Sequence, residues 1–355
     1  MTVLPPDPMN LLPPLPAQPE GVPWPTTAWP EGDPGPDVDA VRLHRLLDEA
    51  FGDPQPEDRL GLSLATVVVH RGRLIAERYG TTAGPDEPLI SWSMAKSITH
   101  AAVGLLVADG LIDVHSPATV PEWQNGNDPR AEITVDHLLR MVPGLEFNED
   151  YVDGSTSHCL EMLWGDEAHL DMAHYAASQP LLHRPDTVFN YSSGTTNIVS
   201  RLLADRVGRG PAFEAWLRQR LLDAIGMTTA EPRFDEAGTF VGSSYLYATA
   251  RDFARFGLLY LRDGVWDGQR LLPQGWVDYA RTPRGIDPES GPYGAHWWVP
   301  RPGQFAAHGY EAQRIICVPD RDLVVVRLGK TVIDLSDNLD GWTAAVIDCV
   351  GTDEP

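Results

Sequence analysis

A serine and a lysine stand three residues apart in the segment Ser93-Met94-Ala95-Lys96, and this pair could form an acyl-transfer site. If the segment opens a helix, both side chains share one face with their Cβ atoms about 5 to 6 Å apart. A serine hydroxyl becomes a strong nucleophile when a base removes its proton, and a lysine acts as that base when burial lowers its pKa. Amides of the first helical turn, including that of Ser93, favour negative charge on an attacked carbonyl oxygen.

The chain has only two lysines, Lys96 and Lys330, which lowers the chance that Ser-x-x-Lys arises at random. Apolar residues follow Lys96 at helical spacing until Gly110, so we expect a buried helix with Ser93 at its first turn. The spacing alone also allows a surface lysine near a helix start.

Strand patterns stand at both ends of the chain, with helical patterns between them. A hairpin is expected at residues 62–70 and 73–78, around an Arg71-Gly72 turn. Further strands are expected at 294–299, 305–308, 313–318 and 323–328. Helices are expected at 38–51, 93–110, 134–141, 159–178, 194–207, 212–225, 249–263, 274–281 and 338–350. This order predicts an α+β fold, in which an antiparallel sheet flanked by terminal helices carries an inserted, mostly helical lobe.

The same pattern predicts three parts of the chain. Residues 1–37 form a Pro-rich arm, either packed as an extended segment or disordered. Residues 38–92 and 290–355 form the α/β lobe, and residues 93–289 form the helical lobe. We expect the catalytic cleft between the two lobes.

The composition excludes several classes of partner. A formal net charge of −23 disfavours binding to nucleic acid and to anionic membrane surfaces. The cysteines are few and odd in number, which argues against a disulfide framework and fits a reducing compartment. The sequence contains neither a secretory signal pattern nor an apolar stretch of membrane-spanning length, so we expect a cytoplasmic location.

Two further motifs, Tyr191-Ser192-Ser193 and Ala307-His308-Gly309, follow Ser93-x-x-Lys96 in order. Together the three resemble the motifs of serine β-lactamases and penicillin-binding proteins. Residues 144–153, 249–257 and 309–313 are similar to the class C-like esterase and 6-aminohexanoate-oligomer (nylon-oligomer) hydrolase branch of that family. The resemblance implies a β-lactamase/transpeptidase-like fold with the site in a cleft between two lobes.

The resemblance also implies roles for the motif residues. Ser93 would attack the substrate, Lys96 and Tyr191 would share the proton relay, and the amides of Ser93 and Tyr310 would form the oxyanion hole. A phenol serves as a base near neutral pH only if a neighbouring ammonium stabilises the phenolate, so Lys96 and Tyr191 would titrate as a coupled pair. Either of them could hold the proton, and a tyrosine buried for packing alone remains the alternative.

The motifs depart from the penicillin-recognising pattern at two places. Ala307-His308 stands where Lys-Thr is usual, and Ser193 stands where class C β-lactamases have asparagine. We therefore expect a serine hydrolase that acts on small carboxylic esters or short linear amides. A β-lactamase, a D-alanyl-peptidase and a non-catalytic ligand-binding protein of the same fold are the alternatives.

The expected substrate contacts are Tyr151, Ser193, Trp298, His308 and Gly309. In the resembled branch the tyrosine matching Tyr151 contacts the substrate amide. The alternative is an exposed acidic loop formed by Tyr151 and its neighbours Glu149, Asp150 and Asp153. Trp298 alternates with a second tryptophan on an expected strand, so either could face the core. His308 could equally be a structural histidine at a strand end.

Other hydrolase chemistries find no support in the sequence. It lacks the Gly-x-Ser-x-Gly elbow of triad hydrolases. His169 and His174 stand five apart, not at the spacing of a zinc-binding His-Glu-x-x-His. We expect no metal and no cofactor, and the sequence does not predict an oligomeric state.

Overall fold

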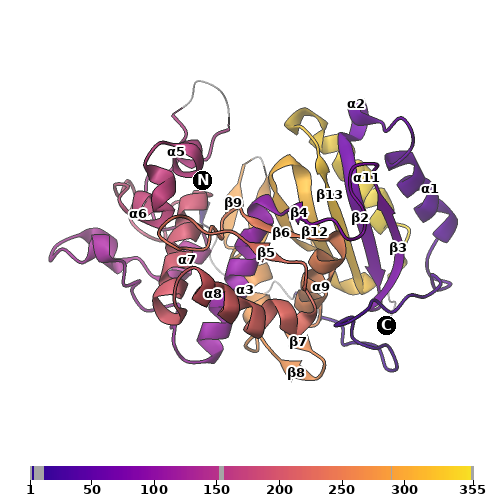
Figure 1. Ribbon diagram of the computed structural model, residues 1–355, viewed down its shortest axis with the longest axis horizontal. Coiled ribbons are helices and arrows are strands. Elements are labelled where there is room, and N and C mark those ends of the chain that lie inside the picture. Colours follow the sequence, from indigo (N-terminus) through magenta and orange to yellow (C-terminus); the bar gives the residue numbers. More distant parts are fainter. Residues whose placement is uncertain (1, 4–11, 152–155, 289, 353–355) are drawn as a thin grey trace.

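The computed structural model describes residues 2–3, 12–151, 156–288 and 290–352. At its centre lies an antiparallel sheet with the strand order β11-β12-β13-β2-β3 (Figure 1). Its strands are β2 (Leu62–His70), β3 (Arg73–Tyr79), β11 (Phe305–Gly309), β12 (Gln313–Val318) and β13 (Leu323–Lys330). The N-terminal hairpin therefore pairs with the C-terminal strands, with Val67 opposite Val326.

Both faces of this sheet are covered, which explains why β2 reads as an almost unbroken apolar run. Val67 and Val69 enter the larger hydrophobic core, whereas Val68 enters a smaller core on the opposite face. The helices over the smaller core are α1 (Ala40–Ala50), α2 (Glu57–Leu60) and α11 (Ser336–Ile347). The helices on the larger core are α3 (Ala95–Ala108) and α9 (Ala250–Leu261).

The remaining helices lie mostly on the other side of α3 from the sheet (Figure 1). They are α4 (Val135–Leu139), α5 (His158–Trp164), α6 (Met172–Ala177), α7 (Ser193–Val207), α8 (Pro211–Leu217) and α10 (Trp276–Arg281). Helix α7 packs against α3, α4 and α6. It is buried from its first residue to Ala204, and this position lets it present a motif residue to α3.

Short strands join the parts of the chain around the site. These are β1 (Thr2–Val3), β9 (Gly285–Asp287) and β10 (Gly291–Tyr293) in one sheet, β4 (Leu89–Ile90), β6 (Leu246–Ala248) and β5 (Glu231–Pro232) in a second, and the pair β7 (Val265–Trp266) and β8 (Gln269–Arg270). Strands β4 to β6 were not expected, because segments this short carry no readable alternation.

Two expected elements differ from the structure. The helix expected at 159–178 is interrupted after α5, because Gly165 adopts an extended conformation and Asp171 then caps the separate helix α6. The strand expected at 294–299 is reduced to isolated bridges of Trp298 with Tyr293 and Ala306. His296 has φ 55°, which turns the backbone out of a strand at this point.

Helix α9 was expected within the helical lobe, but it packs against β12, β13 and β2. The expected helix at 212–225 begins as α8 and continues as a π turn (Arg218–Leu222) and a 3-10 turn (Asp223–Ile225). The boundaries expected between the α/β lobe and the helical lobe stay a prediction.

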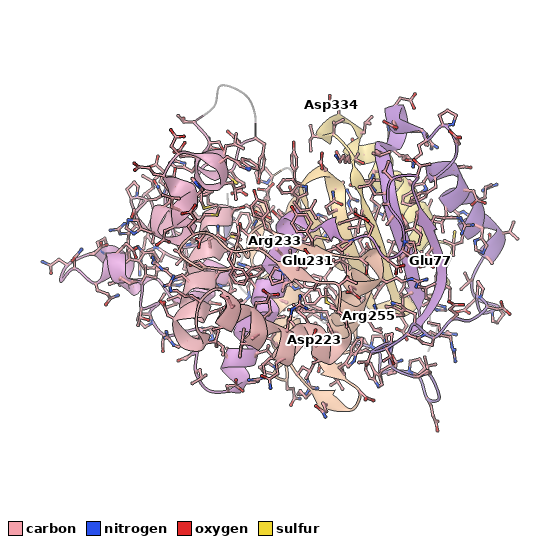
Figure 2. All side chains as sticks on the ribbon, viewed as in Figure 1. Glu77, Asp223, Glu231, Arg233, Arg255 and Asp334 are labelled. Carbon is pink, nitrogen blue, oxygen red and sulfur yellow. The ribbon has the colours of Figure 1, made fainter. Side chains whose placement is uncertain are left out.

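The described part of the Pro-rich arm packs along the molecule as an extended segment. The Pro13 carbonyl accepts a hydrogen bond of 2.7 Å from Arg281, and the Pro25 carbonyl accepts one of 2.7 Å from Arg255, which Figure 2 labels on α9. Further along, Glu31 bridges to Leu74 of β3. Across the described residues, none of the helices combines the length and apolar character needed to cross a bilayer.

A pair of helix glycines tests how closely α9 approaches the sheet. A Cβ atom at Gly257 would lie 2.7 Å from both Ile315 and Val324, whereas a Cβ at Gly341 of α11 would meet no atom within 4 Å. We expect Gly257→Ala to lower the free energy of unfolding by about 1–3 kcal/mol through overpacking. The control Gly341→Ala should raise it by about 0.5–1 kcal/mol, because alanine is the better helix former. Urea unfolding of both variants measures this, and equal effects would contradict the close packing.

Candidate active site

Ser93 lies in a strained turn immediately before the helix that carries Lys96. The turn is a 3-10 segment (Trp92–Met94) that runs directly into α3. Trp92 has φ 45°, a left-handed conformation that costs a non-glycine residue roughly 1–3 kcal/mol and often marks functional sites. The turn is held to β6, because the Ser91 amide donates to the Leu246 carbonyl at 2.8 Å. The expected position of Ser93 at the helix start is thus shifted by one short turn.

Lys96 is buried with a side chain that is 1% exposed. Its Nζ lies within hydrogen-bonding distance of Ser93 Oγ at 2.9 Å, of Ser193 Oγ at 2.9 Å and of the carbonyl oxygen of Ser243 at 3.1 Å. These partners come from the turn before α3, the start of α7 and the segment before β6. The Ser93–Lys96 spacing therefore corresponds to a direct contact at a buried site, and Lys96 is not a surface lysine.

Burial lowers the pKa of Lys96, because the ammonium loses its hydration, while the negative charge of Glu149 acts in the opposite direction. A lowered pKa means that the free amine is available at lower pH than for an exposed lysine. The amine is the form that can accept the proton of Ser93.

Tyr191 sits beside the same ammonium. It precedes Ser192, whose side chain caps α7, and its ring centroid lies 4.8 Å from Lys96 Nζ. Burial raises the pKa of Tyr191, the charge of Glu149 raises it further, and a hydrogen bond with Ser93 opposes both. Burial thus disfavours the charged forms of both groups, so this environment favours a Lys96 amine next to a Tyr191 phenol.

The end of β11 approaches the turn that holds Ser93. A Cβ atom on Gly309 would overlap with the carbonyl oxygen of Ser91, so only glycine fits this approach. Tyr310 follows, and its ring packs edge-on against the Trp92 ring at 5.7 Å. The segment that bears the Tyr310 amide therefore lies beside the turn that holds Ser93, and the role of this amide in an oxyanion hole stays a prediction.

A cavity of about 130 Å³ opens at Ser93. Its lining consists of Trp92, Ser93, Tyr151, Leu160, Leu163, Trp164, Ser244 and Tyr310. Tyr151 reaches over it from the helical side, with its ring 5.1 Å from the Tyr310 ring and its hydroxyl donating to Glu149 at 2.8 Å. Asp153, expected on the same acidic loop, lies outside the described residues.

The other expected substrate contacts take different places. The Ser193 hydroxyl lies between Lys96 and Glu149. Trp298 packs on the Tyr191 ring at 5.3 Å, and His308 stacks on Trp298 at 6.0 Å. Burial together with Arg314 lowers the pKa of His308 to about 3, so this imidazole is neutral near pH 7. The described lining of the cavity does not include Trp298 or His308, and their contact with substrate stays a prediction.

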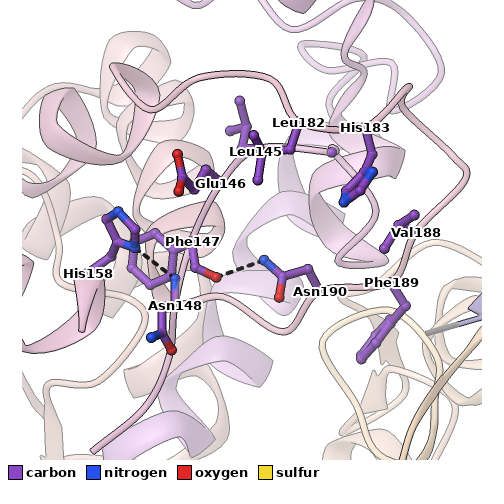
Figure 3. A pocket seen from close by; sticks show the side chains of 11 residues that line it. Leu145, Glu146, Phe147, Asn148, His158, Leu182, His183, Val188, Phe189 and Asn190 are labelled. Atoms are coloured by element: carbon purple, nitrogen blue, oxygen red, sulfur yellow. Dashed lines mark hydrogen bonds between the residues drawn. The ribbon is translucent and has the colours of Figure 1, made fainter. Parts of the chain in front are cut away.

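A larger cavity of about 340 Å³ is lined in part by the segment that leads to Glu149 (Figure 3). Phe147, Asn148, His158 and Asn190 are among its lining residues, whereas Ser93, Lys96 and Tyr191 are not. We therefore take the smaller cavity as the candidate active site. Within the described ranges, no group of three or more His, Cys, Asp or Glu side chains could hold a metal ion.

Sequence reasoning overlooked several residues of this site. Glu149 was noted only as an acidic neighbour of Tyr151, and the lining by Leu160, Leu163 and Trp164 was not expected. These three belong to α5, whose apolar positions look like ordinary core residues in the sequence. Cys159 of the same helix is buried, and its thiol lies 3.5 Å from the Tyr151 hydroxyl.

The fold and the site define a serine hydrolase of the β-lactamase type. The sequence matches the family model described as Beta-lactamase over residues 53–347, so the chain belongs to the β-lactamase family. This family comprises serine hydrolases that include esterases, amidases and β-lactamases. The resemblance drawn from the three motifs and the expected α+β fold are thereby confirmed.

The chain is similar to a 6-aminohexanoate-dimer hydrolase of Paenarthrobacter ureafaciens, with 29% identity over 290 residues that cover 75% of this chain and 72% of the relative. A solved structure from Bacillus anthracis, assigned as a 6-aminohexanoate-dimer hydrolase, has a TM-score of 0.70 and 23% identity over 95% of this chain and 90% of that one. A family VIII carboxylesterase has a TM-score of 0.65 and 13% identity, over 90% of this chain and 99% of its own. These structures share the fold.

The two lysines of the chain allow a matched test of nucleophile activation. Lys96→Met should slow the reaction of Ser93 with a fluorophosphonate by about 10²- to 10⁴-fold, the usual contribution of a general base. Lys330→Met, which changes the other lysine at the end of β13, should react at the parent rate. Mass spectrometry gives the rate, and thermal melting checks that both variants fold. Equal labelling of Lys96→Met and the parent would contradict the role of Lys96.

Proposed function

We propose that the protein hydrolyses small carboxylic esters or short linear amides through an acyl-enzyme on Ser93. The observation that carries this proposal is the buried Lys96 amine group, with Nζ 2.9 Å from Ser93 Oγ and a pKa lowered by burial. A nucleophile paired with a desolvated base is the arrangement that serine acyl transfer needs.

In the proposed reaction, Lys96 takes the proton of Ser93 while Oγ attacks the substrate carbonyl carbon. The amides of Ser93 and Tyr310 donate to the oxygen on which negative charge develops. When the intermediate collapses, the bond to the alcohol or amine leaving group breaks, and the proton from Ser93 passes to that group through Lys96 or Tyr191. Water then attacks the acyl group, gives its proton to the same pair, and releases the carboxylic acid while Ser93 regains its proton.

Two features support an ester or linear amide over a β-lactam. Ala307 is buried in the larger core, so the third motif offers no ammonium for a substrate carboxylate. The Ser193 hydroxyl is held between Lys96 and Glu149, so it is not available to bind an acylamino side chain. The similarity to a 6-aminohexanoate-dimer hydrolase supports a linear amide as one substrate type. The absence of nucleic-acid and membrane partners and the cytoplasmic location stay predictions.

The function is tested with Ser93→Ala and a panel of p-nitrophenyl butyrate, 6-aminohexanoate dimer and nitrocefin. The parent should hydrolyse the ester or the dimer, and Ser93→Ala should reduce that rate by at least about 10³-fold, because no other group supplies the nucleophile. Ser116→Ala, at an exposed serine bonded to Asp113 at 2.8 Å, should leave the rate unchanged.

Retained activity in Ser93→Ala would refute the acyl-enzyme. Turnover of nitrocefin alone would favour a β-lactamase. A parent protein that hydrolyses none of the substrates and resists fluorophosphonate would favour a non-catalytic ligand-binding protein.

A further inference from the structure

The carboxylate of Glu149 accepts hydrogen bonds from two groups of Ser193, the residue that links it to Lys96. The Ser193 hydroxyl donates to Glu149 Oε1 at 2.5 Å, and the Ser193 amide donates to Oε2 at 2.7 Å. The Tyr151 hydroxyl also donates to Oε1, at 2.8 Å. One carboxylate therefore binds the start of α7 and the tyrosine that covers the cavity.

This arrangement fixes which way the Ser193 hydroxyl points. A carboxylate only accepts hydrogen bonds, so the proton of Ser193 Oγ is committed to Glu149. The same oxygen must then accept an N–H from Lys96, which lies 2.9 Å away. The carbonyl of Ser243 likewise only accepts, and it lies 3.1 Å from Nζ.

A neutral lysine amine has two N–H groups and one lone pair. With both N–H groups bound to Ser193 and Ser243, the lone pair points to the third neighbour, Ser93 Oγ. Ser93 is the partner whose proton must be removed. The orientation that activates the nucleophile thus follows from the two acceptors, and Glu149 makes one of them an acceptor.

We propose that Glu149 is a positioning residue of the catalytic site: through the Ser193 hydroxyl it directs the lone pair of Lys96 to Ser93, and its charge sets the pH range in which the site works. This inference rests on the proposed function.

The backbone around Glu149 is anchored, as the proposal requires. The Asn190 side chain donates to the Phe147 carbonyl at 2.9 Å, and the Asn148 amide donates to His158 Nδ1 at 2.9 Å (Figure 3). Asn190 directly precedes Tyr191, so the same contacts hold both sides of the site. Glu146, on the same segment, lines the larger cavity and provides a matched control.

The charge of Glu149 acts on several titratable groups around the site. It opposes the effect of burial on the pKa of Lys96 and raises the pKa of Tyr191. It also raises the pKa of Tyr151, of Cys159 on α5 and of Tyr293 on β10. Two further titratable groups, Asp287 and His296, interact with Lys96 and Tyr191. Asp287 raises the pKa of Tyr191, and Lys96 lowers the pKa of His296. Removing the carboxylate charge lowers the pKa of Lys96 and of Tyr191. The pH profile should therefore move to lower pH whichever of the two is the base.

The test compares Glu149→Gln, Glu149→Asp and Glu146→Gln by pH profiles of kcat and kcat/KM for the ester. Glutamine has one acceptor oxygen where the Ser193 hydroxyl, the Ser193 amide and the Tyr151 hydroxyl all donate. We therefore expect kcat to fall by about 10²-fold with KM little changed. The ascending limb should move to lower pH by about one unit, the effect of an opposite charge within about 4–6 Å. Glu149→Asp keeps the charge, so the ascending limb of its pH profile should stay at the parent position. Its kcat should lie between that of the parent and that of Glu149→Gln. Glu146→Gln should match the parent.

A Glu149→Gln profile that superimposes on the parent profile would overturn the inference, and so would equal behaviour of the Gln and Asp variants. If Glu149→Gln does not fold, Ser193→Ala serves instead. It should lower kcat without moving the limb, because the charge remains; an unchanged kcat would overturn the orienting role. These outcomes are distinct from failure of the proposed function, which is an active Ser93→Ala.

Discussion

A lysine side chain removed from water must either stay charged with enough acceptors around it or become neutral. At 1% exposure, Lys96 meets this constraint with acceptors from the turn before α3, from α7 and from the segment before β6. A buried polar group without hydrogen-bond partners is costly in either protonation state, so these three parts must be in place together. The packing of α7 against α3 and the pairing of β4 with β6 both serve this arrangement.

The same burial sets the acid–base chemistry of the cleft. It lowers the pKa of Lys96 and raises the pKa of Tyr191, so it shifts both groups toward their neutral forms. The negative charge of Glu149 opposes the effect of burial on the pKa of Lys96. In the proposed reaction, activation of Ser93 depends on the direction in which the amine lone pair points.

Local spacing in the sequence predicted the contact between Ser93 and Lys96 and the central hairpin, because these depend on neighbours within one turn or one β-turn. The contact between Glu149 and Ser193 joins residues 44 apart, and no periodicity reports such a pairing. The strand expected at 294–299 does not form as a continuous strand, because His296 has a left-handed backbone. The apolar pattern of the sequence does not indicate this conformation. The prediction of one continuous helix at 159–178 is wrong, because the structure has two helices here. The same apolar period continues on both sides of Gly165, so the sequence does not indicate the break.

A pH titration of protein labelled with ¹³C at the lysine ε-carbon tests directly whether Lys96 is a buried amine base. The chain has two lysines, so the spectrum contains two signals, and Lys330→Met assigns them. We expect Lys96 to titrate below the ordinary lysine pKa of about 10.4, and lower still in Glu149→Gln. A Lys96 signal that titrates at or above that ordinary value would contradict a base role for this side chain.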